Sequence, residues 1–223
     1  LNLIRKQLDD LKGGGLARRS AAPILSLILS DVVGDRLDLI ASGPTVPNLT
    51  TREDIEYIIS KYGLTSRISS SMLGALEREP DTATFEHVQN IIVGSNAQVV
   101  AVAQKQAARE GYRTRVQANS LQGEARDAGR ELARKLRRAR ARPLCILAGG
   151  ETTVTVTGDG RGGRCQELAL AAALELDGVK DVMLISFATD GDDGTTGAAG
   201  AVVTGETLAR ARALGLDARD FLR

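Results

Sequence analysis

The sequence has 223 residues, enough for one large domain or two small ones, and 43% of them are hydrophobic, which can supply a real core. Lysine and arginine number 29 against 28 acidic residues, so the net charge of +1 gives no global field to attract nucleic acid or an acidic membrane. No apolar run reaches the roughly 18 residues that span a bilayer, and the first residues lack the pattern of a secretory signal. A soluble globular protein is therefore expected, without nucleic acid or membrane as a partner.

The few cysteines and the single histidine narrow the chemistry. Cys145 and Cys165 are too few for a disulfide framework and have no zinc-type spacing, so a reducing, intracellular setting is expected. His87 is the only histidine, which excludes Ser-His-Asp, Cys-His and histidine-rich metal sites within one chain. The arginine-rich stretch 130–142 has the spacing of a helix with a solvated outer face. Its basic residues could bind phosphates, but it has no aromatic residues that could stack on bases, so nucleic-acid binding is disfavoured.

The first 86 residues are predicted to combine helices with one strand. Leucine and isoleucine recur at helical spacing near the N-terminus, and the apolar run "ILSLIL" is typical of a strand buried on both faces. The expected elements are a helix over 1–11 that stops at the glycines 13–15, a strand at 24–29, a helix from a Thr50–Glu53 capping box to Gly63, and a helix over about 66–78.

After a connector of loop composition at residues 79–87, strands and helices alternate. The expected elements are strands at 88–93, 113–117, 144–148, 152–157 and 182–188, helices at 96–110, 130–142 and 165–176, and a helix with the start of another at the C-terminus. This alternation predicts an α/β sheet with substantial parallel pairing. We expect one domain over residues 1–86 and another over residues 87–223.

A glycine-rich stretch, "GGETTVTVTGDGRGGRCQE", occupies residues 149–167. Gly158, Gly160 and Gly163 match the G-x-G-x-x-G pattern of dinucleotide-binding folds. The preceding "TTVTVT" alternates, whereas the first strand of such a fold is buried on both faces. An NAD site is therefore disfavoured.

An anion suits the same stretch better. Glycines let backbone N–H groups approach a ligand, and the following helix offers its positive N-terminus. Arg161 and Arg164 add guanidinium groups that pair with carboxylate or phosphate. An arginine at a helix start is unfavourable to the helix dipole unless an anion offsets it. A solvated hairpin loop without a ligand is the alternative.

Carboxylates follow another strand in "TDGDDG". Asp190, Asp192 and Asp193 come after the strand at 182–188, where open α/β sheets bind ligands, and they suit magnesium or a general base. For Asp192 and Asp193, an Asx-type turn is the alternative.

Residues near the N-terminus offer a similar arrangement. Asp31 follows the strand at 24–29, and the downstream Ser42 and Thr45 supply hydroxyls beside a backbone freed by Gly43. Lys12, directly before three glycines, could reach a phosphate, although a lysine at a helix end is also explained by the helix dipole.

Five separated pieces of the chain are informative together: "LKGGGLA", "SLILSDVVGDRLDLIASGPTVPN", "GGETTVTV", "GRGGRCQEL" and "TDGDDGTTGAAGAVV". Together and in this order they resemble the glycerate kinases whose C-terminal region is called the MOFRL domain. The resemblance implies an α/β fold in which residues 1–86 are the C-terminal part of a Rossmann-like domain with a partly parallel sheet. Residues 87–223 would then be the mixed α/β, MOFRL-bearing domain, truncated at its C-terminus.

The same resemblance implies phosphoryl transfer from ATP to D-glycerate with Mg²⁺, giving 2-phosphoglycerate, in a cleft between two domains. Such a reaction needs positioning and charge stabilisation and does not require histidine. The resemblance makes Arg164, Lys12 and Asp190 the expected catalytic residues, with Arg164 as the main anion-binding group. Glu151 and Asp190 are the candidate magnesium ligands. The expected substrate- or nucleotide-binding residues are Gly149, Gly150, Glu151, Gly160, Arg161, Gly162, Gly163, Ser42 and Gly43.

Two departures from the family stand out. Family members usually carry asparagine where this chain has Cys165, which replaces a polar contact by a weak thiol donor. The family is also longer, with a part expected before Leu1 and a segment with Asn-Asp-Ser and Thr-Gly-Thr-Asn motifs expected after Arg223. We therefore expect little kinase activity from these 223 residues alone.

Two other functions stay open at this point. The chain could act as an inactive ligand-binding or interaction module, or as an NAD-linked hydroxypyruvate reductase. A cytoplasmic address is expected, with a mitochondrial one left open, and so is the formation of a homo-oligomer.

Overall fold

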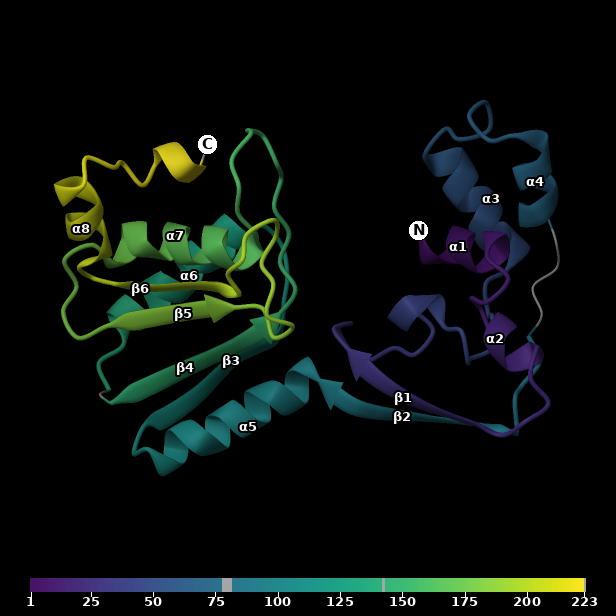
Figure 1. Ribbon diagram of the computed structural model, residues 1–223, viewed down its shortest axis with the longest axis horizontal. Helices are drawn as coiled ribbons and strands as arrows, with labels where there is room; N and C mark the ends of the chain where they lie inside the picture. Colours follow the sequence, from purple (N-terminus) through teal and green to yellow (C-terminus); the bar gives the residue numbers. More distant parts are fainter. Residues whose placement is uncertain (78–81, 142, 223) are drawn as a thin grey trace. The chain divides into compact units, whose positions relative to one another are not determined.

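The computed structural model describes residues 1–77, 82–141 and 143–222. Its contacts divide the chain into two compact units, Leu1–Asn96 and Ala97–Arg223, each with its own helices and strands (Figure 1). The fold is mixed α/β, as expected, with two parallel strand pairs and one antiparallel pair. Within the described ranges, no helix is long and apolar enough to cross a membrane.

The first unit contains one strand pair and several short helices. In chain order they are α1 (Asn2–Leu8), α2 (Gly15–Arg18), β1 (Ile24–Ser30), the 3-10 turn η1 (Ile40–Ser42), α3 (Arg52–Lys61), α4 (Ser70–Leu76) and β2 (Val88–Ser95). β1 and β2 pair in parallel, from Ile24 opposite Val88 to Ser30 opposite Ser95. α4 is shorter than expected, and residue 78, where that helix was expected to end, lies outside the described residues.

Burial along β1 alternates instead of being continuous. Leu25, Leu27 and Leu29 are 59%, 64% and 76% exposed, whereas Ile24 and Ile28 are partly buried. The expectation of burial on both faces is therefore wrong for the described chain, because the described elements cover only one face of this strand. An apolar run shows which residues favour burial and does not show what packs on them.

The capping box of α3 lies one residue later than expected. The Thr51 hydroxyl accepts from the N–H of Asp54 at 3.2 Å, and the Asp54 carboxylate accepts from the N–H of Thr51 at 3.0 Å. Thr50 is buried instead, and its N–H donates to the side chain of Asn48 at 3.1 Å. Two adjacent threonines, each followed three residues later by an acid, made the pattern ambiguous.

The second unit alternates helices and strands, as expected. Its elements are α5 (Asn96–Arg109), β3 (Arg113–Leu121), α6 (Ala125–Arg138), β4 (Leu144–Gly150), α7 (Arg164–Leu176), β5 (Met183–Phe187), β6 (Gly200–Thr204), α8 (Thr207–Ala213) and the 3-10 turn η2 (Asp220–Leu222). β3 and β4 pair in parallel, and β5 and β6 pair antiparallel. Arg142, the expected end of the arginine-rich helix, lies outside the described residues.

α6 and α7 approach each other closely because small residues lie between them. A Cβ added at Gly129 would lie 2.1 Å from the carbonyl oxygen of Leu168, so only glycine fits there. The buried residues around this helix pair form two clusters. The larger consists of Ala133, Ala169, Ala172, Ala173, Leu176, Val203, Leu208 and Ala218, and the smaller of Ala125, Ala128 and Leu168. α7 packs on one face of the β5–β6 pair, and Ile185 and Phe187 of β5 are exposed on the other face.

The strand expected at residues 152–157 does not form. Thr153 makes only an isolated bridge to Glu124, and the segment continues as a loop. The Glu124 carboxylate accepts from the hydroxyl of Thr155 at 2.6 Å and from its N–H at 3.2 Å, which ties the loop to the start of α6. The sequence argument against a dinucleotide fold relied on that strand. Gly158, Gly160 and Gly163 do not directly follow a strand, because residues 154–163 form a loop, which fits that fold no better.

The sequence interpretation missed the strand β6, and it placed the domain boundary before β2. β6 is five residues long, begins with Gly200 and is followed by Gly205, so its pattern was too short to stand out. β2 pairs with β1, which is why the first compact unit extends to Asn96. The domain ranges 1–86 and 87–223 stay a prediction.

Replacing Gly129 with alanine should destabilise the second unit by about 1–3 kcal/mol, because the added methyl overpacks the α6–α7 contact. Urea denaturation followed by circular dichroism measures this. The matched control is Gly74→Ala in α4, where an added Cβ meets nothing within 4 Å, so helix propensity alone should stabilise by up to about 1 kcal/mol. An unchanged midpoint for Gly129→Ala would contradict the close contact.

The loop anchor at Glu124 should weaken in acid. Hydrogen bonds from the Thr155 hydroxyl and N–H lower the pKa of Glu124 below its ordinary value of 4.5. A lowered pKa means that the anchor is complete above pH 4.5 and is lost as the pH falls through the folded-state pKa. The amide proton shift of Thr155 should therefore titrate with a midpoint below 4.5. Glu124→Gln should abolish this titration, and a midpoint above 4.5 would refute the anchor.

Candidate functional site

Arg164 and Glu151 form an ion pair at the two ends of the glycine-rich loop. The Arg164 Nη1 lies 2.8 Å from the Glu151 Oε1, and the two side chains are 42% and 44% exposed. The N–H of Glu151 donates to the carbonyl of Leu121 at 2.9 Å, which fixes Glu151 to the end of β3. The fold thus brings together two candidate residues that are 13 positions apart, and both remain accessible to a ligand.

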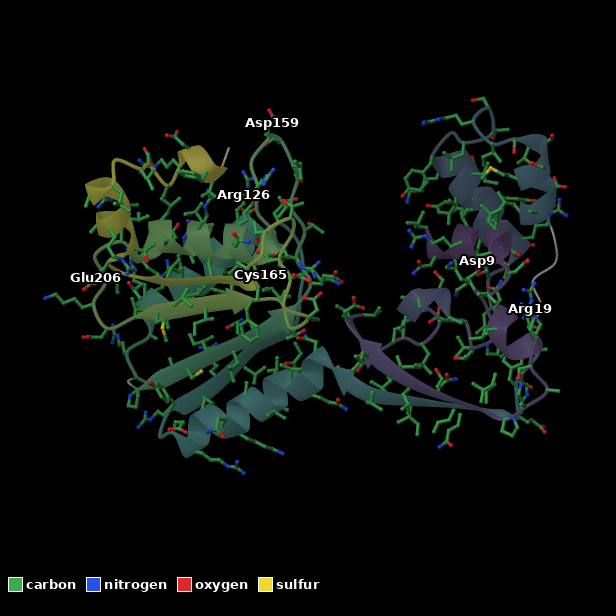
Figure 2. All side chains as sticks on the ribbon, in the orientation of Figure 1. Asp9, Arg19, Arg126, Asp159, Cys165 and Glu206 are labelled. Carbon is green, nitrogen blue, oxygen red and sulfur yellow. The ribbon has the colours of Figure 1, made fainter. Side chains whose placement is uncertain are left out.

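The loop between them projects into solvent, with Asp159 at its outer tip (Figure 2). Gly160, Arg161 and Gly162 are exposed, and a Cβ added at either glycine would meet no described atom within 4 Å. Packing therefore does not require these two glycines. Their lack of side chains leaves the backbone accessible, and ligand binding by these glycines stays a prediction.

Other glycines of the stretch have a packing role. A Cβ at Gly150 would lie 2.2 Å from the backbone of Leu121, and one at Gly163 would lie 2.3 Å from the carboxylate of Asp193. Gly149 lies within β4. Close backbone approach explains Gly150 and Gly163 without a ligand.

Asp193 binds the N-terminus of α7, which the sequence interpretation had reserved for an anionic ligand. Its side chain is 2% exposed, and its two oxygens accept from the N–H groups of Cys165 at 3.0 Å and Gln166 at 2.8 Å. Asp193 is therefore neither a turn residue nor a free carboxylate. The N–H groups of Cys165 and Gln166 are therefore already satisfied, so an incoming anion would have to use other donors, such as the guanidinium groups of Arg161 and Arg164.

Asp190 and Asp192 stay at the surface of the same acidic loop. The Asp190 carboxylate accepts from the N–H of Asp192 at 3.3 Å, so an Asx-type turn forms at Asp190, whereas the sequence interpretation had considered such a turn for Asp192 and Asp193. Across residues 1–77, 82–141 and 143–222, no three His, Cys, Asp or Glu side chains lie close enough to hold a metal ion together. A magnesium ion held by Glu151 or Asp190 would therefore need oxygens from the nucleotide, which is its usual mode in kinases.

Cys165 lies in the first turn of α7, directly after Arg164, and its N–H is one of the two that donate to the buried Asp193 carboxylate. Burial raises the pKa of its thiol. The thiol is neutral at physiological pH, so it adds no negative charge beside Arg164, and in this respect it resembles the asparagine expected from the family.

Two candidate segments of the first unit lie against each other. The N–H of Gly13 donates to the carbonyl of Ser42 at 2.9 Å, and that of Gly14 donates to Gly43 at 2.8 Å. Lys12 precedes this contact and pairs with the Asp9 carboxylate, so its ammonium is held at the edge of the glycine turn.

The Ser42 and Thr45 hydroxyls are used within the unit. Ser42 donates to Asn2 at 3.2 Å and Thr45 donates to Asn90 at 2.5 Å, and both residues are buried. Ser42 has φ of 62°, a conformation that side chains rarely adopt. Asp31 is exposed directly after β1.

Sequence reasoning missed a buried lysine beside this segment. Lys6 is 6% exposed, and its ammonium lies 3.5 Å from the Asp38 carboxylate. A buried lysine needs a paired charge, so the pair ties α1 to the loop that carries Ser42. Lys6 and Asp38 lie far apart in the sequence, so no local pattern indicates that they pair.

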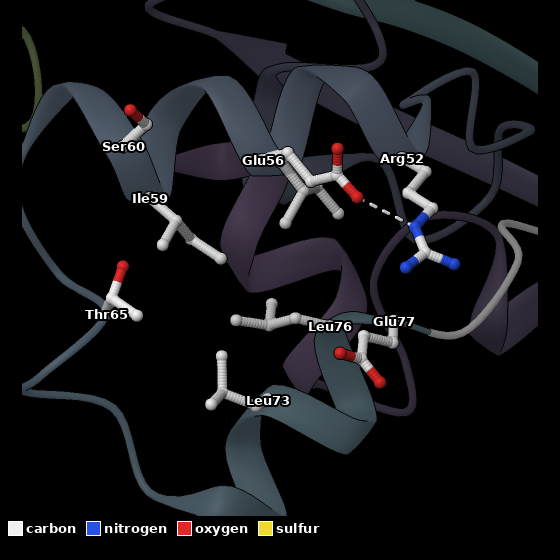
Figure 3. Close-up of a pocket in the computed structure, with 9 residues that line it drawn as sticks. Arg52, Glu56, Ile59, Ser60, Thr65, Leu73, Leu76 and Glu77 are labelled. Carbon is white, nitrogen blue, oxygen red and sulfur yellow. Dashed lines mark hydrogen bonds and ion pairs between the residues drawn. The ribbon is translucent and has the colours of Figure 1, made fainter.

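The first unit also contains a cavity of about 350 Å³ between α3 and α4 (Figure 3). Its wall is mostly apolar, and an Arg52–Glu56 ion pair of 2.8 Å lies at its edge. The residues that line it are Arg52, Ile55, Glu56, Ile59, Ser60, Thr65, Leu73, Leu76 and Glu77. The candidate site residues are separate from this cavity.

Comparison with known proteins identifies the family. Residues 144–223 match the MOFRL family, and residues 1–77 match a domain of unknown function, DUF4147. Glycerate kinase of Macaca fascicularis is 40% identical over the whole of this chain and 69% of its own length, and glycerate kinase of Bos taurus is 41% identical over 52% of its own length. The crystal structure of glycerate kinase from Thermotoga maritima superposes with a TM-score of 0.85 at 40% identity, over 99% of this chain and 54% of that one.

The chain spans about half the length of most of the curated relatives that it matches. The match nonetheless runs from end to end of this chain and includes both family regions in order. The chain belongs to the glycerate kinase family.

Proposed function

We propose that the protein transfers the γ-phosphoryl group of ATP to D-glycerate and forms 2-phosphoglycerate. The relatives named glycerate kinase and D-glycerate 2-kinase support this reaction. The Arg164–Glu151 pair carries the proposal within the structure, because it presents a guanidinium group beside an exposed glycine loop. Phosphoryl transfer depends on such positioned charges.

Arg164 is the proposed group that binds and stabilises the transferring phosphoryl. Glu151 occupies the guanidinium in the present structure, so an anionic ligand would compete with Glu151 for it. Glu151 and Asp190 are the proposed protein ligands of Mg²⁺, which would neutralise charge on the phosphates when bound. Asp190 is also the candidate acceptor of the proton that leaves the glycerate hydroxyl.

The remaining assignments are also proposals. Lys12, Ser42 and Gly43 form the candidate binding group of the first unit, and Gly149, Gly150, Gly160, Arg161, Gly162 and Gly163 form that of the second. A cytoplasmic address is consistent with the free thiols of Cys145 and Cys165, and a homo-oligomer is kept as a proposal. Because the relatives are longer than the matched region, low turnover by the 223 residues alone is expected.

Arg164→Ala should lower turnover about a hundredfold or more, since it removes a positioned cation from the phosphoryl-transfer site. ATP-dependent phosphorylation of D-glycerate measures this. The assay uses the chain itself and a chimera in which it replaces the matching 54% of the Thermotoga maritima enzyme. Binding of ATP should weaken in parallel, as titration calorimetry would show.

Arg138→Ala is the matched control, because Arg138 is exposed on α6 away from the loop and its loss should leave turnover unchanged. Near-normal turnover of Arg164→Ala would remove this residue from the reaction. Absence of D-glycerate phosphorylation by both the chain and the chimera would overturn the proposed function.

A further inference from the structure

α7 begins without a side-chain cap of its own. Its N-cap residue is Gly163, which has no side chain, so the first N–H groups of the helix need acceptors from elsewhere. Asp193 supplies them from a loop 27 and 28 positions away, with one oxygen on each of two consecutive amides. A single buried carboxylate therefore decides where α7 starts.

The carboxylate is itself held in place through its backbone. The Asp193 carbonyl accepts from the Thr196 hydroxyl at 2.9 Å and from the Gln166 side chain at 3.3 Å. The Gln166 amide also donates to the Thr196 hydroxyl at 2.7 Å, and the Asp193 N–H donates to Ala198 at 3.0 Å. The acidic loop and the first turn of α7 thus share a closed set of hydrogen bonds.

Steric fit leaves this arrangement almost no freedom. A Cβ at Gly163 would lie 2.3 Å from the Asp193 carboxylate, and one at Gly194 would lie 1.9 Å from the carbonyl oxygen of Gly162. Backbones of the two loops are therefore in direct contact. The residue between Gly163 and the capped amide of Cys165 is Arg164.

We propose that Asp193 is a positioning residue that holds Arg164 at the phosphate-binding position beside Glu151. The inference rests on the proposed function for what Arg164 binds. Arg164 brings a positive charge to the positive end of α7, and the buried negative charge of Asp193 offsets it without occupying the guanidinium. Glu151 can then leave Arg164 when a phosphate arrives, while Asp193 keeps the helix start in place.

The test follows Arg164 directly. The side-chain Nε–Hε signal of Arg164 in a proton–nitrogen correlation spectrum of the full chain is identified by its loss in Arg164→Lys. In Asp193→Asn one amide of α7 faces an NH₂ group, so the Arg164 signal should move by more than its line width, together with the amides of Cys165 and Gln166. Asp127→Asn makes the same charge change at an exposed acid in the first turn of α6 and should leave the Arg164 signal in place.

A milder variant serves where Asp193→Asn does not fold. Thr196→Val keeps the carboxylate and removes the hydroxyl that holds its backbone, so the Arg164 signal should move in the same direction by a smaller amount. An unmoved Arg164 signal in a folded Asp193→Asn or Thr196→Val protein would overturn the proposal.

Kinetics separate positioning from simple destabilisation. Turnover per folded molecule should fall about tenfold or more in Asp193→Asn, because a small displacement of a catalytic group is enough for that loss. A purely structural role would lower the folded fraction and leave turnover per folded molecule unchanged, which would contradict the proposal. Absence of turnover in both the wild-type chain and the chimera, together with an Arg164 signal that nevertheless depends on Asp193, would refute the proposed function and leave the positioning role supported.

Discussion

The contact between α6 and α7 is the constraint on which the candidate site depends. Gly129 lets the two helices approach until their backbones are in contact, and the alanines around it keep the spacing small. The N-terminal ends of both helices then hold the two sides of the glycine-rich loop, Glu124 through Thr155 and Arg164 through Glu151. Larger residues between the helices would separate these anchors.

Three carboxylates organise this end of the unit, and each has a different exposure. Glu124 is partly buried and anchors the loop, Glu151 is half exposed and pairs with Arg164, and Asp193 is buried and caps α7. The buried carboxylate carries the lasting structural role because the N-cap residue, Gly163, has no side chain that could accept from the amides of Cys165 and Gln166. The half-exposed one is exchangeable, since a surface ion pair contributes little to stability.

The sequence predicted most elements of the fold, because the periodicity of long segments such as 96–110 and 165–176 is decided locally. It failed at residues 152–157, where alternating threonine and valine suggested a strand and Glu124 instead ties the segment to α6 as a loop. It also failed at β1, whose apolar residues do not reveal that one face is uncovered in the described chain.

The sequence also predicted part of the candidate site, again where the pattern is local. Arg164 and Glu151 were found as members of one glycine-rich motif, and the fold does pair them. The role of Asp193 could not be read from its own acidic loop, because the first amide that it caps, that of Cys165, lies 28 residues earlier. The need for a remote cap comes from the absence of a side chain at Gly163. The Lys6–Asp38 pair was missed likewise, since it joins residues 32 positions apart that share no motif.

The exposed tip of the loop has a consequence for handling the protein. Arg161 stands between two unpacked glycines, which makes the peptide bond after it a suitable site for limited tryptic cleavage. A cut there would leave Glu151 and Arg164 on separate polypeptides. The Thr155 anchor and the Asp193 cap lie on opposite sides of the cut and hold the two pieces independently, so the nicked protein should keep its ion pair without a continuous chain between the partners.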